Sequence, residues 1–328
     1  MTVLVTGATG FLGSHIAEIL ANSGKQVRAL VRRSSDTSFL EKLPNVELCF
    51  GAVEDRESLQ RAAAGVEYLI HSAGVVKASS KREFFRINEG GTENAVAAAL
   101  HAGPQFKRFV LVSSLAALGP SDAQGNAVPS ERSPMPCTTY GESKLAAERA
   151  VLKYQDRLSS VMVRPPTIYG PRDREVLIFF KTVKNGVLPL TSPLDAKFSM
   201  IYGPDAADAC VRGMSAAVRS GSGYFVDDGK VYSFRDMIEL TEAAVGKKAW
   251  LRLPIPKRVV RTLALGSELY GKATKQAVMF TREKCNDLFS QWVCDSTETR
   301  KDLGWEPKVP FAEGIMLTAD WYRKAGWL

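Results

Sequence analysis

Residues 6–15 read TGATGFLGSH and decide the fold, because they place three glycines between an apolar strand and a helix. Gly7 permits the tight turn, Gly10 lets the backbone approach a pyrophosphate, and Gly13 lets helix and strand pack closely. Free N–H groups and the dipole at the helix N-terminus favour an anion there. The segment therefore predicts a dinucleotide-binding loop, whereas a glycine-rich turn without a ligand is the alternative.

The sequence on the C-terminal side of this loop alternates between strand and helix patterns. Short apolar runs, typical of strands buried on both faces, occur at 2–5, 26–31, 46–50, 68–71 and 108–113. Helical patterns lie between and after them, at 12–22, 56–64, 89–102 and 140–155. Repeated strand–helix units predict an α/β fold with a Rossmann-type doubly wound parallel sheet.

The pattern changes after residue 164, where RPPTIYGPRD is rich in proline and glycine and predicts a loop. Helical patterns follow at 176–184, 206–218 and 234–245, with a strand at 224–226. We predict a dinucleotide-binding domain over residues 1–170. Residues 171–328 are predicted to form mostly a smaller, mixed α/β substrate domain, with some segments returning to the Rossmann sheet.

The composition is that of an ordinary globular protein, with 45% hydrophobic and 24% charged residues. No stretch approaches the roughly 20 apolar residues that cross a bilayer, and the N-terminus lacks a signal-peptide pattern. A cytoplasmic location is the expectation. Five dispersed cysteines indicate reduced thiols, and three histidines far apart in sequence predict no metal site.

The net charge of +8 is concentrated in one segment. Residues 247–284 hold ten basic residues against Glu268 and Glu283. A field so localised favours an anionic surface or ligand nearby, although a solvated face is the alternative. The segment contains no recognised nucleic-acid module, so no nucleic-acid partner is expected.

A helix is predicted within this segment, after Pro256, a residue favoured at the start of helices. Apolar residues at 259, 260 and 263 share one face, and basic residues at 257, 258 and 261 lie largely on another. Such a helix can rest on an anionic membrane surface, cover an apolar pocket, or pack on its own domain. A peripheral membrane-surface contact through 247–284 therefore remains one of three interpretations.

The end of the second predicted strand bears on the choice between NADP and NAD. The chain reads ALVRR there, with Arg32 and Arg33 and no acidic residue before Asp36. A carboxylate repels a 2′-phosphate, whereas a guanidinium pairs with it in bidentate geometry. The sequence favours NADP over NAD, and solvent-facing arginines without a ligand are the alternative.

The segment YGESK places Tyr140 and Lys144 one helical turn apart, on one face. A phenol with a pKa of about 10 is a poor base at neutral pH, and a nearby ammonium lowers that pKa. The tyrosine then exchanges a proton with a hydroxyl or ketone as hydride moves. Ser114 follows the fifth strand, at the sheet edge where ligands collect, and is predicted to orient the substrate oxygen.

Taken together, these motifs resemble those of the extended short-chain dehydrogenases/reductases over essentially the whole chain. That group includes NDP-sugar epimerases and dehydratases, dihydroflavonol reductases and 3β-hydroxysteroid dehydrogenases. The resemblance rests on TGATGFLG, on HSAG at 71–74, on the set Ser114, Tyr140 and Lys144, on RPPTIYGP at 164–171 and on the pattern from Asp295 to Pro307.

The resemblance implies a set of cofactor-binding residues, in which Lys144 also bonds the nicotinamide ribose. The set is Gly7, Thr9, Gly10, Phe11, Leu12, Gly13, Arg32, Arg33, Val53, Ala73, Gly74, Asn88, Ser113, Tyr140, Lys144, Pro165 and Ile168. It also implies a homodimer that pairs through two helices from each subunit.

Two departures from the family pattern bear on ligands. Residues 51–53 read GAV where many members have an aspartate for the adenine amine, so adenine is expected to rest on apolar contacts. Leu118 precedes Gly119 where sugar-nucleotide epimerases often carry an aromatic residue, which disfavours a hexose substrate.

Three functions remain open at this point. The favoured one is an NADP-dependent oxidoreductase for a bulky apolar alcohol or ketone, such as a steroid, isoprenoid or flavonoid-like molecule. The second is a nucleotide-sugar epimerase, dehydratase or reductase, in which Arg172 and Arg174 would meet a diphosphate. The third is a non-catalytic NADP-binding protein, which the intact catalytic set argues against.

Overall fold

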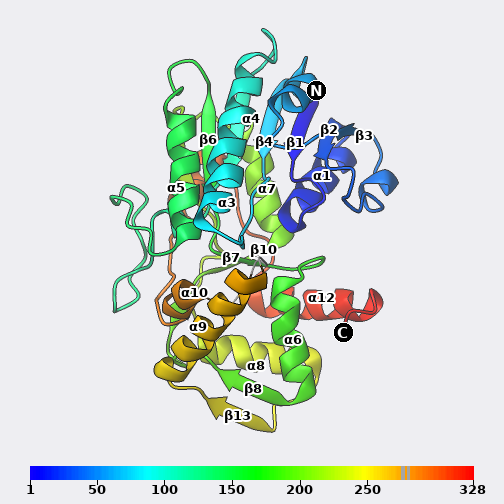
Figure 1. Cartoon of the computed structure of the whole chain (residues 1–328). Helices are drawn as coiled ribbons and strands as arrows, with labels where there is room; N and C mark the ends of the chain where they lie inside the picture. Colours follow the sequence, from blue (N-terminus) through cyan, green and yellow to red (C-terminus); the bar gives the residue numbers. More distant parts are fainter. Residues whose placement is uncertain (275–277, 279–280) are drawn as a thin grey trace.

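The computed structural model describes residues 1–274, 278 and 281–328, without the side chain at position 272. Its centre is a seven-stranded parallel sheet in the order β11-β6-β5-β4-β1-β2-β3 (Figure 1). The strands are β1 Thr2–Thr6, β2 Gln26–Val31, β3 Val46–Phe50, β4 Tyr68–His71, β5 Arg108–Val112, β6 Ser160–Arg164 and β11 Ser222–Phe225. This arrangement confirms the predicted Rossmann-type fold.

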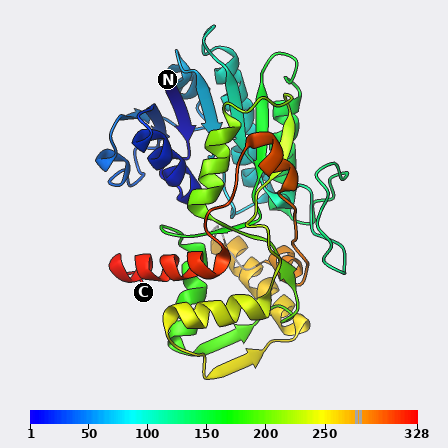
Figure 2. The ribbon, with the colours of Figure 1, turned by 180° about the vertical axis from the view of Figure 1, so that it is seen from behind.

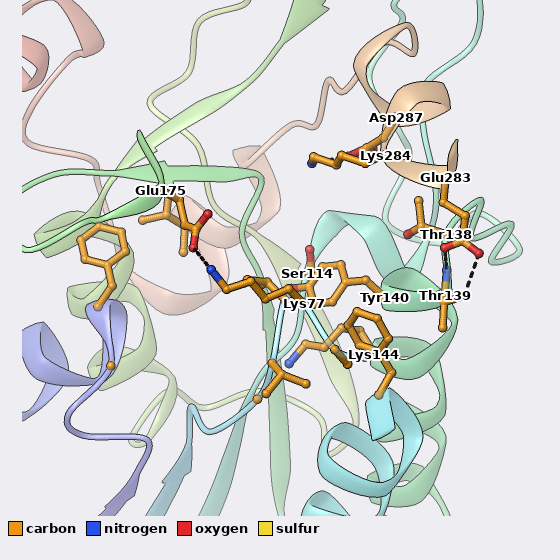
Figure 3. A pocket seen from close by; sticks show the side chains of 18 of the residues that line it. Lys77, Ser114, Thr138, Thr139, Tyr140, Lys144, Glu175, Glu283, Lys284 and Asp287 are labelled. Carbon is orange, nitrogen blue, oxygen red and sulfur yellow. Dashed lines mark hydrogen bonds and ion pairs between the residues drawn. The ribbon is translucent and has the colours of Figure 1, made fainter. Parts of the chain in front are cut away.

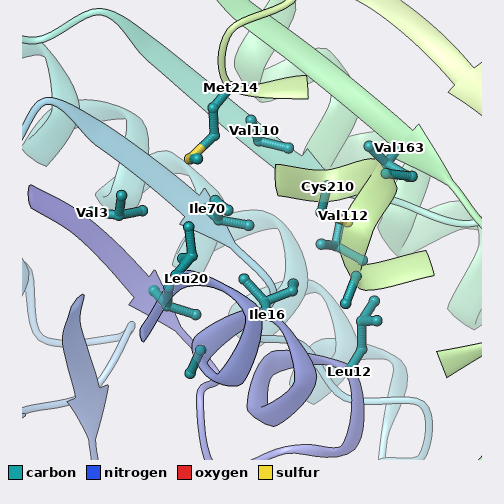
Figure 4. Packing of buried hydrophobic residues seen from close by; sticks show 14 of the residues in the cluster. Val3, Leu12, Ile16, Leu20, Ile70, Val110, Val112, Val163, Cys210 and Met214 are labelled. Carbon is teal, nitrogen blue, oxygen red and sulfur yellow. The ribbon is translucent and has the colours of Figure 1, made fainter. Parts of the chain in front are cut away.

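Helices cover both faces of the sheet, which explains why its strands lack an apolar–polar alternation. Alternate strand residues point to opposite faces, so Val3 and Val5 belong to one core and Leu4 to the other. Helices α1 (Phe11–Asn22) and α7 (Gly203–Gly213) cover the first face, and Figure 4 shows Ile16 and Cys210 in that core. The opposite face is covered by α2 (Arg56–Ala63), α4 (Gly91–Leu100) and α5 (Thr139–Leu152).

A smaller lobe lies beyond the carboxyl edge of the sheet, in the lower half of Figures 1 and 2. Its main elements are α6 Glu175–Asn185, β8 Val187–Leu190, α8 Phe234–Val245, β13 Leu251–Pro254, α9 Lys257–Thr274, α10 Arg282–Leu288 and α12 Phe311–Lys324. Between β6 and β11 the chain enters this lobe and returns to the sheet through α7. The lobe therefore closes over the end of the sheet where ligands of such folds bind.

Short elements complete the structure. They are η1 Leu40–Lys42, α3 Lys81–Phe85, the π-helical turn η2 Arg86–Gly90, η3 Leu115–Ala117, β7 Thr167–Tyr169, β9 Lys197–Phe198, β10 Met200–Tyr202, β12 Tyr232–Ser233 and α11 Thr297–Leu303. Within the described ranges, no helix combines the length and the apolar character that a membrane span requires.

Two local predictions were wrong. The segment at 164–173, predicted as a loop, contains β7, because its Thr167–Tyr169 backbone pairs in parallel with β10. The helix predicted at 89–102 begins earlier, in the π-helical turn at Arg86–Gly90, and ends at Leu100. Positions 275–277, 279 and 280 of the predicted basic segment lie outside the described residues.

Candidate active site

The glycine loop forms a cradle that leaves no room for larger residues. Gly7 has φ +70°, and a Cβ atom there would stand 2.7 Å from the Ala73 nitrogen. A Cβ atom on Gly13 would stand 2.1 Å from the Gly7 carbonyl oxygen. Helix α1 starts directly after Gly10, which has no side chain with which to cap the first N–H groups. The loop thus fits the diphosphate of a dinucleotide.

A cavity of about 880 Å³ extends from this cradle to the smaller lobe. Ser114, Tyr140 and Lys144 lie along its wall, as Figure 3 shows. Helices α9 and α10 contribute Glu268, Gly271, Glu283, Lys284 and Asp287 on the side of the lobe. The wall includes both the glycine cradle and residues of the smaller lobe, so cofactor and substrate would share this one cleft.

The three predicted catalytic residues converge from two elements. Ser114 lies at the carboxyl end of β5, and its hydroxyl hydrogen-bonds Tyr140. Tyr140 stands in the first turn of α5, whose N-cap Thr138 accepts a hydrogen bond from the Gly141 nitrogen at 3.0 Å. Lys144, one turn further, is buried, and its Nζ donates to the Val112 carbonyl oxygen at 2.6 Å.

Burial has the largest effect on the pKa values of Tyr140 and Lys144. Desolvation raises the pKa of Tyr140 above its usual value of 10, and the hydrogen bond to Ser114 opposes the rise. Desolvation lowers the pKa of Lys144 to about 8, against the attraction of Glu148. Lys144 does not offset this rise in the protein without its cofactor, so the lowering of the tyrosine pKa by Lys144 stays a prediction.

Asn88 connects two segments of the site through hydrogen bonds. Its Nδ2 donates to the Val75 carbonyl oxygen at 3.0 Å and to the Ser143 hydroxyl at 2.8 Å, and its Oδ1 accepts from the Val75 nitrogen at 2.8 Å. The side chain leaves the π-helical turn η2, a geometry frequent at functional sites. Asn88 thus fixes the loop after β4 to the catalytic helix α5.

The smaller lobe is attached directly to helix α5, which carries Tyr140 and Lys144. Glu283 of α10 accepts hydrogen bonds from the Thr139 nitrogen at 2.7 Å and the Thr139 hydroxyl at 2.8 Å, next to Tyr140. On the other side of the cavity, Lys77 pairs with Glu175 of α6 at 3.1 Å (Figure 3). Sequence patterns did not indicate either link, since both partners are distant in the chain.

The structure brings most of the predicted site residues to the cavity wall. These are Gly7, Gly10, Phe11, Leu12, Gly13, Gly74, Ser113, Ser114, Tyr140, Lys144, Pro165 and Ile168. The remaining predicted residues, which lie outside that wall, are Thr9, Arg32, Arg33, Val53, Ala73 and Asn88. Arg32 and Arg33 are exposed just after β2, with the Arg33 guanidinium 5.4 Å from the centre of the Phe50 ring.

Arg172 and Arg174, which the sequence offered as diphosphate ligands of an epimerase, contact residues outside the cavity wall. Arg172 bonds Glu18 at 2.7 Å and stacks on Phe39 at 4.1 Å. Arg174 lies 4.9 Å from the Trp327 ring centre. Neither arginine lines the cavity, so the role considered for them in the sequence stays a prediction that these contacts do not favour.

Comparison with known proteins decides the family. The model of the NAD dependent epimerase/dehydratase family matches residues 3–226. The chain belongs to this family. It is accordingly an extended short-chain dehydrogenase/reductase, as the sequence predicted, and an enzyme of the dehydrogenase/reductase type.

Individual relatives cover nearly the whole chain. Ceramide reductase of Caulobacter vibrioides is 35% identical over 99% of this chain and 96% of its own length. Sterol demethylase protein B of Methylococcus capsulatus is 30% identical over 99% of both chains. Among solved structures, the NAD complex of Thermus thermophilus UDP-glucose 4-epimerase has a TM-score of 0.78 at 25% identity, covering 99% of this chain and 100% of its own.

A buried ion pair that the sequence analysis missed anchors helix α5 to the sheet. Glu148 lies one turn after Lys144 and accepts from the Arg164 Nε and from its second guanidinium nitrogen, both at 2.8 Å. The Ser113 hydroxyl donates to the same carboxylate at 2.5 Å. The signal in the sequence was the spacing of Tyr140, Lys144 and Glu148 at intervals of four, which places all three on one helix face.

Replacing Glu148 with glutamine tests this anchor. Glu148→Gln leaves the buried Arg164 without its counter-charge, so we expect the free energy of unfolding to fall by about 3 kcal/mol. The Glu148 carboxylate raises the pKa of Lys144 by electrostatic attraction, so its removal should lower that pKa. The fall of kcat on the alkaline side of the pH profile should then begin at a lower pH. Urea unfolding and a pH–rate profile measure the two effects.

Glu142→Gln, on the same helix, is the matched control for this change. Glu142 pairs with Lys81 at 2.6 Å on the exposed surface, and losing that pair should cost less than about 1 kcal/mol. Equal effects of the two substitutions would show that the Glu148 pair does not anchor the helix.

Proposed function

We propose that the protein is an NADP-dependent oxidoreductase that interconverts a ketone and an alcohol on a bulky, apolar substrate. The chemistry of the substrate side of the cavity carries this proposal. Among the described residues that line it there is no arginine, and Glu268, Glu283 and Asp287 face it from α9 and α10. Lys284 pairs with Asp287 at 2.5 Å and Glu268 pairs with Arg282 at 2.9 Å. This part of the wall therefore lacks the arginine that would hold a nucleotide diphosphate in bidentate geometry. Val76, Phe84 and Val176 add apolar surface.

The residues of the site divide the proton chemistry between them. Tyr140 holds its proton until the substrate oxygen gains charge, because burial keeps the phenol neutral. Ser114 bonds both this phenol and, in our proposal, the substrate oxygen, which sets the distance for transfer. The Lys144 ammonium then stabilises the phenolate that remains. The nicotinamide cofactor, when bound, supplies or accepts the hydride.

The relatives support an apolar substrate class. The names of the two relatives above refer to a ceramide and a sterol, both of which are bulky and lipid-like. The UDP-glucose 4-epimerase structure favours a sugar nucleotide as a second candidate substrate. The contacts of Arg172 and Arg174 away from the cavity count against that candidate.

A substrate panel tests the proposal. The NADPH-loaded protein is mixed separately with hydrophobic ketones of graded size and with sugar nucleotides, while the absorbance of the reduced nicotinamide is followed. We expect oxidation of NADPH with the ketones and not with the sugar nucleotides. Conversion of a sugar nucleotide without net NADPH oxidation would instead support an epimerase.

The preference for NADP is tested at Arg32 and Arg33. Because both guanidinium groups are exposed after β2, the double substitution Arg32→Gln/Arg33→Gln should weaken NADP binding at least about 30-fold. Binding of NAD should change less than about threefold, since NAD lacks the 2′-phosphate. Calorimetric titration measures both, with the exposed Arg61→Gln as control. Equal losses for the two cofactors would contradict the assignment.

A further inference from the structure

Helix α9 has two faces with different surroundings. Its inner face packs Val260 and Ala264 against Cys285 of α10, and Gly271 lines the cavity. The helix therefore forms part of the wall between the cavity and solvent. In Figure 1 it lies in the smaller lobe, beside α10 and between the sheet and the strands β8 and β13.

The outer face of α9 is apolar. Val259, Leu263, Leu269 and Tyr270 expose 47%, 57%, 58% and 59% of their surface. The prediction that Val259, Val260 and Leu263 share one face was wrong, because Val260 turns inward and the other two turn outward. Four large apolar side chains on the outside of one helix mark an interaction surface rather than a solvated face.

The exposed charges in the first turns of α9 are positive, and the Lys257 ammonium lies 5.2 Å from the centre of the Phe289 ring. Lys257, Arg258 and Arg261 are exposed, and in the described part of the chain none of the three forms an ion pair with a carboxylate. Glu268, the single acidic residue in the α9 sequence, lines the cavity and bonds Arg282 at 2.9 Å. Directly before the helix, Trp250 and Leu253 are also exposed.

We propose that α9 lies in the surface of an anionic membrane, with its outer face among the lipid headgroups and acyl chains. An apolar face on a helix whose exposed polar side carries basic residues is the arrangement of interfacial helices. Anionic lipid complements Lys257, Arg258 and Arg261. A second copy of the chain, docked through its own α9, would supply the same basic residues and no acidic residue other than Glu268, which bonds Arg282.

This docking gives the site a route to its substrate. One face of α9 meets the membrane, and its other face lines the cavity with Glu268 and Gly271. A lipid-like ketone can therefore pass from the membrane into the cavity beside α9 without crossing water. This step rests on the proposed function, whereas binding of α9 to the membrane does not.

Vesicle co-sedimentation tests the docking with the full-length chain. Vesicles of phosphatidylglycerol and phosphatidylcholine should bind the wild type at least about tenfold more tightly than vesicles of phosphatidylcholine alone. Leu263→Gln/Leu269→Gln keeps good helix formers and should weaken this binding at least about tenfold. The matched control is Met316→Gln/Leu317→Gln, which removes two similarly exposed apolar residues from α12 and should bind as the wild type does.

Two further readouts separate the outcomes. Hydrogen exchange of the wild type should slow at 257–274 on addition of the anionic vesicles, a result independent of any variant. Reduction of a short, water-soluble ketone without vesicles tests the proposed function by itself. The docking proposal is overturned if the wild type stays in the supernatant, if both double variants bind equally, or if the α9 variant only converts a dimer to a monomer.

Discussion

Tyr140→Phe lowers kcat for ketone reduction by about a thousandfold or more while leaving the Kd for NADP within about threefold of the wild type. The change removes one hydroxyl, which hydrogen-bonds Ser114 and holds the proton to be transferred. The ring and its packing near Phe84, at 6.4 Å between ring centres, remain. Steady-state kinetics and a cofactor titration measure the two quantities.

Tyr154→Phe is the control for this substitution, because Tyr154 is a partly exposed phenol that lies outside the cavity wall. It should retain wild-type kcat. If Tyr140→Phe keeps more than about a tenth of the wild-type kcat, the hydroxyl is not the proton donor that we assign.

Lys144→Met is expected to lower kcat by about a hundredfold or more and, at the same time, to stabilise the fold. The difference between the ordinary lysine pKa of 10.5 and its pKa of about 8 here corresponds to about 3 kcal/mol against folding at neutral pH. Methionine leaves the Val112 carbonyl without its hydrogen bond, which costs about 1–2 kcal/mol. A net gain of about 1–2 kcal/mol in unfolding free energy remains.

The pH dependence of that gain has a definite sign. Since the fold lowers the lysine pKa, the unfolded chain binds more protons between pH 8 and 10.5, and the stability of the wild type rises with pH across this window. The advantage of Lys144→Met should therefore be complete below about pH 8 and disappear toward pH 10.5. Urea unfolding at pH 7 and pH 10 measures it. A variant less stable than the wild type at pH 7 would contradict burial as the cause of the pKa shift.

The sequence indicated the nucleotide half of the molecule well, because its signals are local. The glycines of residues 7–13 and the pair Tyr140 and Lys144 lie within one turn and one helix, so their spacing alone defines their geometry. Buried parallel strands also carry a strong pattern, since both faces are apolar. The predicted strand at 26–31 matches β2 for this reason.

The parts that sequence reasoning missed depend on contacts between distant residues. The Glu148–Arg164 pair joins a helix to a strand, and Glu283 reaches Thr139 across 144 positions. The outward orientation of Val259 and Leu263 followed from the packing of α9 on α10, which periodicity cannot specify. The fall of the lysine pKa also required burial that only the fold reveals.

Transfer of label from the cofactor tests the central claim most directly, that Tyr140 moves a proton where hydride moves. The protein is loaded with NADPH deuterated at the transferable position of its ring and given a hydrophobic ketone for a single turnover. The account predicts an alcohol that carries one deuterium on carbon, formed by the wild type and not by Tyr140→Phe. An unlabelled product, or labelled alcohol formed equally fast by both proteins, would contradict it.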